Sequence, residues 1–235
     1  MKIDITQRKL KLQRKLLKNH YYIIIFFLTF SLLLVGISSF LVGRFPRNKG
    51  VGDFPGVCKI SPDGVNCIGT GFLVENDLII TAGHVVNDLG VDAEVTLIFK
   101  DETVYNGIVE RIEYDPNIAH MDVALVRLEK DVENPEWLMT LGDSERVDEG
   151  EEVRVPGYGY DCLYDAPRGS ISAIRPDENI LVSDVDINPG HSGAPVYSLT
   201  QKSIIGIIIK GPKPDTGEGK KAIIAINKII EILEL

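Results

Sequence analysis

Residues 187–195 read Ile187-Asn188-Pro189-Gly190-His191-Ser192-Gly193-Ala194-Pro195, and the interpretation of the whole chain starts from this stretch. Two shorter stretches precede it, Thr81-Ala82-Gly83-His84 and Met121-Asp122-Val123-Ala124-Leu125. Together the three supply a hydroxyl, an imidazole that can accept its proton, and a carboxylate that can orient the imidazole. One such stretch alone would be an ordinary turn or strand end. Their occurrence together predicts His84, Asp122 and Ser192 as a catalytic triad.

At these residues the chain resembles the chymotrypsin-like (trypsin-like) serine peptidases. It looks most like the HtrA/Deg branch, whose pattern around the nucleophile is I-N-P-G-N-S-G-G-P. The likeness runs by motif order over roughly residues 55–232 and includes residues 69–74, GTGFLV, ahead of the histidine. It implies a serine endopeptidase that cleaves polypeptides through an acyl-enzyme, with no cofactor and no metal. No counterpart of the PDZ domain common in that branch is expected here.

The resemblance also implies two further parts of the site. The backbone N–H groups of Gly190 and Ser192 would form the oxyanion hole. The substrate would add as an extended strand beside Ile209, Lys210 and Gly211, a common mode of peptide recognition.

Two interpretations of the specificity pocket stay open. Asp186 stands six residues before Ser192, where trypsin-type enzymes keep an aspartate that selects Lys or Arg. Alternatively, Ile187 and Ile209 close a shallow apolar pocket that selects small aliphatic residues. We favour the apolar pocket, with Asp186 as a solvated surface residue.

The chain departs from the family pattern at two positions beside the nucleophile. His191 replaces the usual Asn, and Ala194 replaces Gly. These departures keep a second hypothesis open, namely a catalytically silent module with a protease fold that binds extended peptides.

From about residue 55 onward, the chain consists of short apolar runs separated by Gly, Asp and Pro, which is typical of an all-β fold. With the family likeness, we expect two six-stranded antiparallel β-barrels and a C-terminal helix over Asn227 to Leu233, with Asn227 as its N-cap. The expected strands are Cys67–Val74, Leu78–Thr81, Ala93–Phe99, Val104–Tyr114, Val123–Leu128, Val153–Gly157, Ser170–Ile174, Ile180–Ser183, Ala194–Tyr197, Ser203–Lys210 and Ala222–Ile226.

An uncharged apolar run, residues 21–43, predicts one transmembrane helix ahead of this domain. As a helix it would span about 34 Å, enough for a hydrocarbon core of about 30 Å. Seven basic residues precede it, which places residues 1–20 in the cytoplasm and the remainder outside. We therefore divide the chain into a basic segment (1–20), an anchor (21–43), a linker (44–54) and a peptidase domain (55–235). A cleavable signal peptide is the competing interpretation.

Charge is distributed unevenly along the chain. Residues 1–50 hold ten of the 25 basic residues and one of the 34 acidic ones, so residues 51–235 carry a net charge of −18. A segment as acidic as residues 51–235 repels phosphate backbones, which argues against nucleic-acid binding. No His, Cys and Asp cluster has the spacing of metal ligands.

The three cysteines all fall in the predicted extracytoplasmic part. A hairpin turn at residues 61–64 would place Cys58 opposite Cys67, and an oxidising compartment permits a disulfide between them. Two half-buried free thiols are the alternative. Cys162 is left over in either case.

Overall fold

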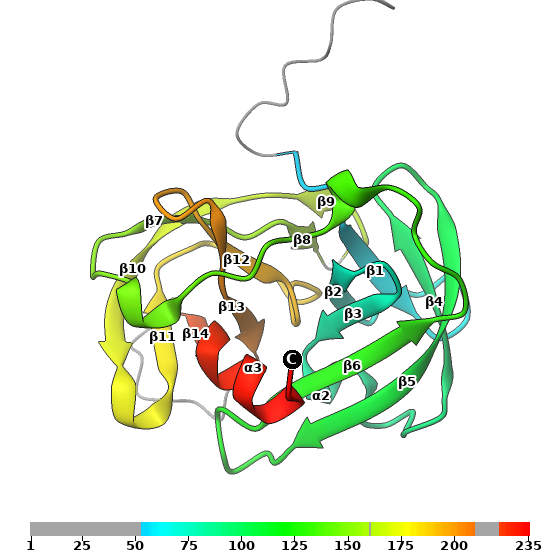
Figure 1. Cartoon of the computed structure of the whole chain (residues 1–235), viewed down its shortest axis with the longest axis horizontal. Coiled ribbons are helices and arrows are strands. Elements are labelled where there is room, and N and C mark those ends of the chain that lie inside the picture. The colour runs from blue at the N-terminus through cyan, green and yellow to red at the C-terminus, as the bar shows by residue number, and fades with distance from the viewer. Residues whose placement is uncertain (1–52, 160, 210–220) are drawn as a thin grey trace, which may run out of the picture. The chain divides into compact units, whose positions relative to one another are not determined.

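The computed structural model describes residues 53–159, 161–209 and 221–235. Its strands close into two six-stranded barrels, which are followed by a C-terminal helix (Figure 1). The predicted all-β class, the two barrels and the terminal helix are therefore confirmed. Three strands, at residues 78–81, 104–114 and 180–183, have the predicted boundaries.

The first barrel is built from the strands between residues 57 and 128. Its order is β1-β2-β3-β6-β5-β4, and every neighbouring pair is antiparallel. The bounds are β1 Val57–Ser61, β2 Gly69–Glu75, β3 Leu78–Thr81, β4 Glu94–Phe99, β5 Val104–Tyr114 and β6 Asp122–Leu128.

The second barrel has the order β10-β11-β14-β13-β12-β7, again with antiparallel neighbours. A separate two-stranded hairpin, β8 with β9, lies between β7 and β10 in sequence. The bounds are β7 Glu152–Arg154, β8 Gly157–Tyr158, β9 Tyr164–Asp165, β10 Arg168–Arg175, β11 Ile180–Ser183, β12 Pro195–Ser198, β13 Ser203–Ile209 and β14 Lys221–Ala225.

Strand β13 is covered on both of its faces. All seven of its residues are buried. Ile205 and Ile208 belong to the core of the second barrel. Ile204, Ile207 and Ile209 belong instead to the larger apolar cluster, which contains the core of the first barrel and also residues of β11 and β14. A run of isoleucines without polar alternation is the pattern expected of a strand that is covered on both sides.

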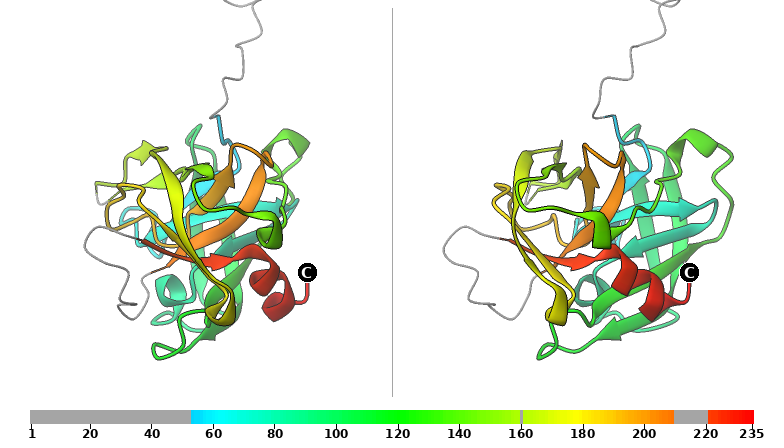
Figure 2. Two further views of the ribbon diagram at one scale, coloured as in Figure 1. Left: turned by 90° about the vertical axis from the view of Figure 1, so that its left-hand side faces the viewer. Right: turned by 60° about the vertical axis from the view of Figure 1, so that its left-hand side comes forward.

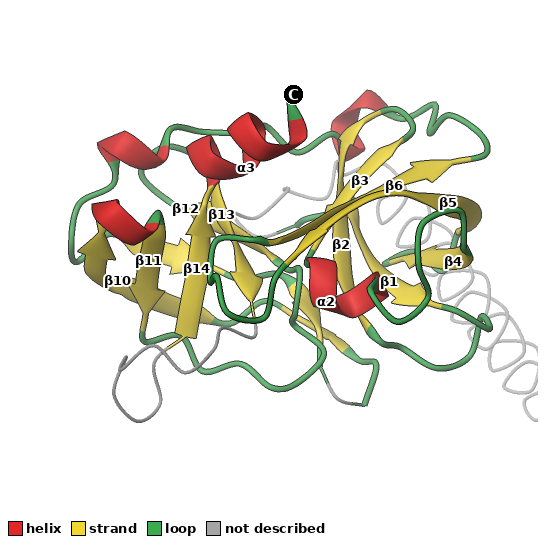
Figure 3. Cartoon of the chain, turned by 90° about the horizontal axis from the view of Figure 1, so that it is seen from below, coloured by secondary structure: helices red, strands yellow, loops and turns green. Residues whose placement is uncertain are grey.

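Within the described residues, two α-helices accompany the barrels. The one-turn helix α2, Gly83–Val86, contacts β5 and β6 of the first barrel, and α3, Ile226–Leu233, packs on β13 and β14 (Figures 2 and 3). Three short 3₁₀ turns complete the structure, η1 Pro135–Trp137, η2 Ser144–Arg146 and η3 Pro176–Glu178.

Asn227 does not cap α3 as predicted, because the N-cap position falls on Ala225. The Asn227 side chain reaches η2 instead. Its Oδ1 accepts a hydrogen bond from the Ser144 amide at 3.0 Å, and its Nδ2 donates to Asp143 at 2.9 Å. The residue therefore ties the terminal helix to the segment that joins the barrels.

The predicted register of the first hairpin is wrong. Cys58 lies opposite Gly71, and Ile60 lies opposite Gly69, so the connecting loop is longer than a four-residue turn. The backbone amides of this loop donate to the Asp63 carboxylate, whose Oδ1 accepts from Val65 at 2.9 Å and from Asn66 at 2.7 Å. Cys58 and Cys67 are consequently not cross-strand partners, and both are free thiols.

The predicted anchor at residues 21–43, the basic segment before it and most of the linker lie outside the described residues. Within the part that the structure describes, none of the helices has the length and apolar character needed to span a bilayer.

Candidate active site

His84 and Asp122 lie in direct contact. His84 is the second residue of α2, and Asp122 is the first residue of β6. The imidazole Nδ1 lies 2.8 Å from Oδ2 and 3.1 Å from Oδ1 of the carboxylate, and the backbone N–H of His84 donates to Oδ1 at 2.8 Å. A carboxylate only accepts hydrogen bonds, so Nδ1 carries a proton, and in the neutral ring Nε2 then has the lone pair.

The local sequence explains this close approach. Gly83 has no side chain, and a Cβ there would lie 3.0 Å from Cβ of Tyr114 and 3.1 Å from the backbone nitrogen of Val123. Helix α2 can therefore press against the start of β6. Asp122 is only 3% exposed, whereas the His84 side chain is 16% exposed, so the imidazole is the more accessible member of the pair.

Ser192 lies in a tight turn that leads into β12. Gly190 and Gly193 on either side have φ angles of +107° and +82°, a conformation that residues with a Cβ rarely adopt. The Ser192 carbonyl accepts a hydrogen bond from the Thr70 amide of β2 at 2.9 Å. The turn of the second barrel is thus bonded to a strand of the first.

The turn also packs against the segment that leads into His84. A Cβ on Gly193 would lie 2.3 Å from the Thr70 carbonyl oxygen and 2.7 Å from the backbone nitrogen of Ala82. Ala82 stands two residues before His84. The fold therefore brings together the three stretches that the sequence singles out, although they lie far apart along the chain.

The N–H groups of Gly190 and Ser192 are available for a ligand. Among the described residues, neither amide has an acceptor within hydrogen-bond range. The Gly190 carbonyl, in contrast, is fixed by the Thr70 hydroxyl, which donates to it at 2.9 Å. The same hydroxyl accepts from the Tyr158 amide at 3.0 Å. Thr70 therefore holds the turn and β8 together.

Both departures from the family pattern are accommodated next to β8. His191 and Ala194 are fully buried. Gly157 makes room for them, since a Cβ at that position would lie 2.9 Å from Cδ2 of His191 and 3.0 Å from Cβ of Ala194. The extra methyl group and the imidazole are compatible with this turn because residue 157 has no side chain.

The residues predicted for specificity divide into three groups. Asp186 is exposed, as a solvated carboxylate would be. Ile187 and Ile209 are 8% and 6% exposed and belong to the two apolar cores. Lys210 and Gly211 lie outside the described residues.

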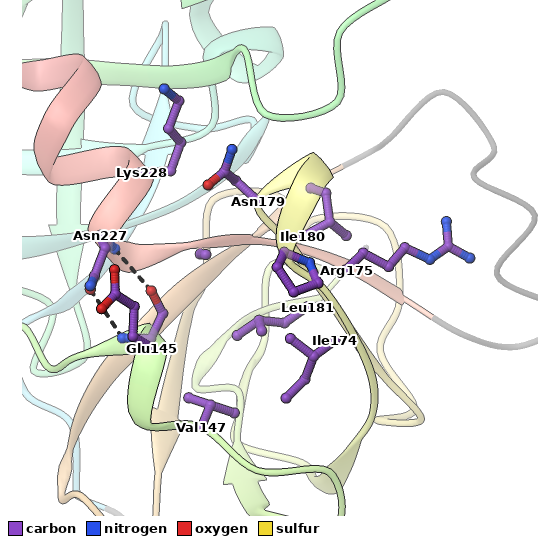
Figure 4. Close-up of a pocket in the computed structure, with 12 residues that line it drawn as sticks. Glu145, Val147, Ile174, Arg175, Asn179, Ile180, Leu181, Asn227 and Lys228 are labelled. Atoms are coloured by element: carbon purple, nitrogen blue, oxygen red, sulfur yellow. Dashed lines mark hydrogen bonds between the residues drawn. The ribbon is translucent and has the colours of Figure 1, made fainter.

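A cavity of about 310 Å³ lies elsewhere on the second barrel (Figure 4). Apolar side chains of β10 and β11 form its floor, and Arg175, Asn179 and Lys228 surround it. Neither the candidate triad nor the predicted specificity residues line it. Within the described part of the chain, no group of three or more His, Cys, Asp or Glu side chains is arranged to hold a metal ion.

Cys67 interacts with Cys162 as well as with Cys58. Burial, together with the neighbouring Cys162 thiol, raises the pKa of Cys67 to about 12. Complete burial raises the pKa of Cys58 far above its ordinary range. The thiol predicted to be left over, Cys162, is therefore a neighbour of Cys67, which the sequence did not indicate.

Comparison with known proteins places the chain in a family. Residues 69–207 match the trypsin-like peptidase domain. This match covers more than half of the chain, so the protein belongs to the trypsin-like peptidase domain family. The resemblance inferred from the sequence is confirmed.

The curated relatives are bacterial. A probable periplasmic serine endoprotease, DegP-like, from Marinomonas sp. (strain MWYL1) is 30% identical over 147 residues, which cover 60% of this chain and 29% of that protein. Its counterpart from Halomonas elongata is 33% identical over 147 residues, with 60% and 28% covered. The matched region thus spans less than a third of each relative.

Two solved structures share the fold. A serine endoprotease from Yersinia pestis has a TM-score of 0.61 at 22% identity, and covers 77% of this chain and 62% of that one. The inactive form of the Rv3671c protease has a TM-score of 0.59 at 22% identity, and covers 77% and 88%.

Proposed function

We propose that this protein is a serine endopeptidase that hydrolyses polypeptides through His84, Asp122 and Ser192. The observation that carries the proposal is that Asp122 makes hydrogen bonds to both the backbone N–H and the ring Nδ1 of His84, beside a serine turn flanked by glycines. A merely structural aspartate at a strand end would have no reason to bond both the backbone and the ring of one histidine.

The mechanism follows from the hydrogen-bonding capacity of each group. Asp122 keeps the proton on Nδ1, so Nε2 can take the Ser192 proton as Oγ attacks the peptide carbonyl. The resulting oxyanion binds the free amides of Gly190 and Ser192. His84 then returns its proton to the leaving amine, and water hydrolyses the acyl-enzyme by the same steps in reverse order.

For substrates, we propose extended segments of polypeptide that pair with the backbone around Ile209 to Gly211. Selection of Lys or Arg requires an inward-facing carboxylate, and the exposed Asp186 does not favour it. We therefore propose a preference for small aliphatic residues before the cleaved bond.

We also propose that the peptidase domain works outside the cytoplasm, anchored by residues 21–43. The asymmetry of basic residues around this segment supports the orientation. The word periplasmic in the names of the DegP-like relatives supports an extracytoplasmic site of action. To test the anchor, cells that express the chain with or without residues 21–43 are fractionated. The full chain should stay with the washed membranes, whereas the chain without residues 21–43 should be lost from them.

The decisive experiment treats the full chain with a fluorophosphonate, which reacts with activated serines. Wild type, Ser192→Ala and, as a matched serine control on β10, Ser172→Ala are compared, together with cleavage of casein. Labelling and cleavage in wild type and Ser172→Ala, but not in Ser192→Ala, would support the enzyme. Absence of labelling in all three, with retained binding of extended peptides, would support the silent binding module instead.

A further inference from the structure

The His191 ring, which the proposed mechanism does not use, makes two polar contacts inside the protein. Its side chain has no exposed surface. Nε2 lies 2.7 Å from Oδ1 of Asp165, and Nδ1 lies 3.2 Å from the carbonyl oxygen of Asn188. Asn188 belongs to the serine turn, whereas Asp165 ends β9 on the neighbouring hairpin. The ring therefore connects the two segments.

The chemistry of these partners constrains the ring. A carbonyl oxygen and a carboxylate oxygen can only accept hydrogen bonds. The short contact of Nε2 with Asp165 is therefore an N–H donor bonded to a carboxylate oxygen, which makes it a charge-assisted hydrogen bond. Such charge-assisted bonds are shorter and stronger than those between neutral groups. A buried polar ring without such partners would be costly.

The His191 ring belongs to the turn that carries both amides proposed to bind the oxyanion. His191 is the residue between Gly190 and Ser192, so its backbone joins the two amides proposed to bind the oxyanion. The Gly190 backbone packs against the hairpin, where a Cβ would lie 2.6 Å from the Tyr158 carbonyl oxygen. The Thr70 hydroxyl also donates to the Gly190 carbonyl. The turn is thus bonded to the first barrel through Thr70 and to the β8–β9 hairpin through the His191 ring.

We propose that Asp165 and His191 form a positioning pair that sets the oxyanion geometry. This inference rests on the proposed function. The carboxylate of Asp165 orients the buried ring, and the ring in turn fixes the peptide units on both sides of residue 191. Neither side chain touches the reacting atoms. The pair provides a reason for the histidine at a position where the resembling enzymes have asparagine.

The main test variant is Asp165→Asn. The Asp165 side chain is 55% exposed, so the fold is expected to tolerate the change, and loss of charge weakens the bond to Nε2. Removal of an oxyanion donor lowers kcat by about 10²–10³-fold, so misplacement of the turn should lower it by about 10- to 100-fold. KM should stay within about threefold, because the amides bind the transition state more strongly than the substrate.

The matched control is Asp161→Asn in the same hairpin. The Asp161 carboxylate accepts from the Leu163 amide at 3.1 Å, and among the described residues no hydrogen bond or ion pair joins it to His191. This variant removes the same charge and should leave kcat unchanged. Thermal unfolding of every variant shows whether a loss of activity reflects a loss of structure.

A double-mutant cycle separates positioning from any independent role of Asp165. In a His191→Asn background the carboxylate no longer has a ring to orient, so adding Asp165→Asn should lower kcat by no more than about twofold further. The rate of fluorophosphonate labelling of Ser192 should follow kcat in all four proteins.

The outcomes are distinguishable. An unchanged kcat in Asp165→Asn, or an equal loss in the wild-type and His191→Asn backgrounds, overturns the positioning pair while the peptidase stands. Absence of Ser192-dependent labelling in wild type overturns the proposed function, and the pair with it. A loss confined to the wild-type background, with KM and the unfolding temperature maintained, supports the pair.

Discussion

Asp122→Asn tests the core of the proposed mechanism. The wild-type carboxylate faces two donors, the backbone N–H of His84 at 2.8 Å and the ring Nδ1 at 2.8 and 3.1 Å. An asparagine has a single acceptor oxygen. If that oxygen keeps the backbone bond, the amide NH₂ faces Nδ1. The ring must then carry its proton on Nε2, and it can no longer accept the Ser192 proton.

The expected loss follows from this change of tautomer. Such a substitution in a Ser-His-Asp site lowers kcat by about 10⁴-fold. At about 1.36 kcal/mol for each factor of ten, this equals about 5 kcal/mol of transition-state stabilisation. The stability of the fold should fall much less, by about 1.5–3 kcal/mol for a hydrogen bond to a charged group.

The assay is hydrolysis of casein, together with urea unfolding of the same samples. Asp115→Asn is the matched control, because its carboxylate caps the neighbouring loop by accepting from the Asn117 amide at 2.8 Å. If Asp122→Asn kept kcat within about tenfold of wild type while Ser192→Ala abolished it, Asp122 would not be the orienting carboxylate.

Three further predictions concern the surroundings of the site. Thr70→Val should lower the free energy of unfolding by about 1–3 kcal/mol, because the Tyr158 amide loses its acceptor. The same variant should also lower kcat. Urea titration and steady-state kinetics measure the two effects. Retained stability would contradict the bridging role of Thr70. Gly193→Ala should lower the free energy of unfolding by more than about 3 kcal/mol, because φ at this position is +82° and the new Cβ would clash with the Thr70 carbonyl oxygen. A thermal unfolding temperature equal to that of wild type would refute the packing described. Burial raises the pKa of the Cys58 thiol above its ordinary value of about 9. As pH rises, this thiol therefore ionises in the unfolded chain before it ionises in the folded one, and the free energy of unfolding falls above about pH 9. Urea titrations from pH 7 to 10.5 should show this fall, and a thiol reagent at pH 8 should modify Cys58 only after unfolding.

Much of the fold could be predicted because its signals are local. The runs at residues 78–81, 104–114 and 180–183 are bounded by turn residues and form strands over those same residues. The stretches around His84, Asp122 and Ser192 could be found because each chemical role needs one residue type within a short, recognisable motif. Their order along the chain then indicated the family.

The errors arose where a side chain formed hydrogen bonds other than those that the sequence pattern predicted. The hairpin after β1 has a different register because Asp63 binds the loop amides that would otherwise have continued the ladder. Asn227 leaves the helix N-terminus to bind the segment at Ser144. The Asp63 bonds form within one loop, where a local side-chain turn competes with the strand ladder. The Asn227 bond depends instead on how closely two separate elements approach, which sequence spacing does not describe.

The sequence by itself thus determined the class of fold, the family and the three residues proposed for catalysis, since these depend on composition, periodicity and short motifs. Only the tertiary structure brought Thr70 and Asp165 to the serine turn, from positions 122 and 27 residues away from Ser192. Thr70 lies in the GTGFLV stretch that carries part of the family likeness, but that stretch does not indicate a bond to the serine turn, and no local pattern marks Asp165. Their roles arise because hydrogen bonds form between groups that are close in space, and barrel closure decides which groups those are.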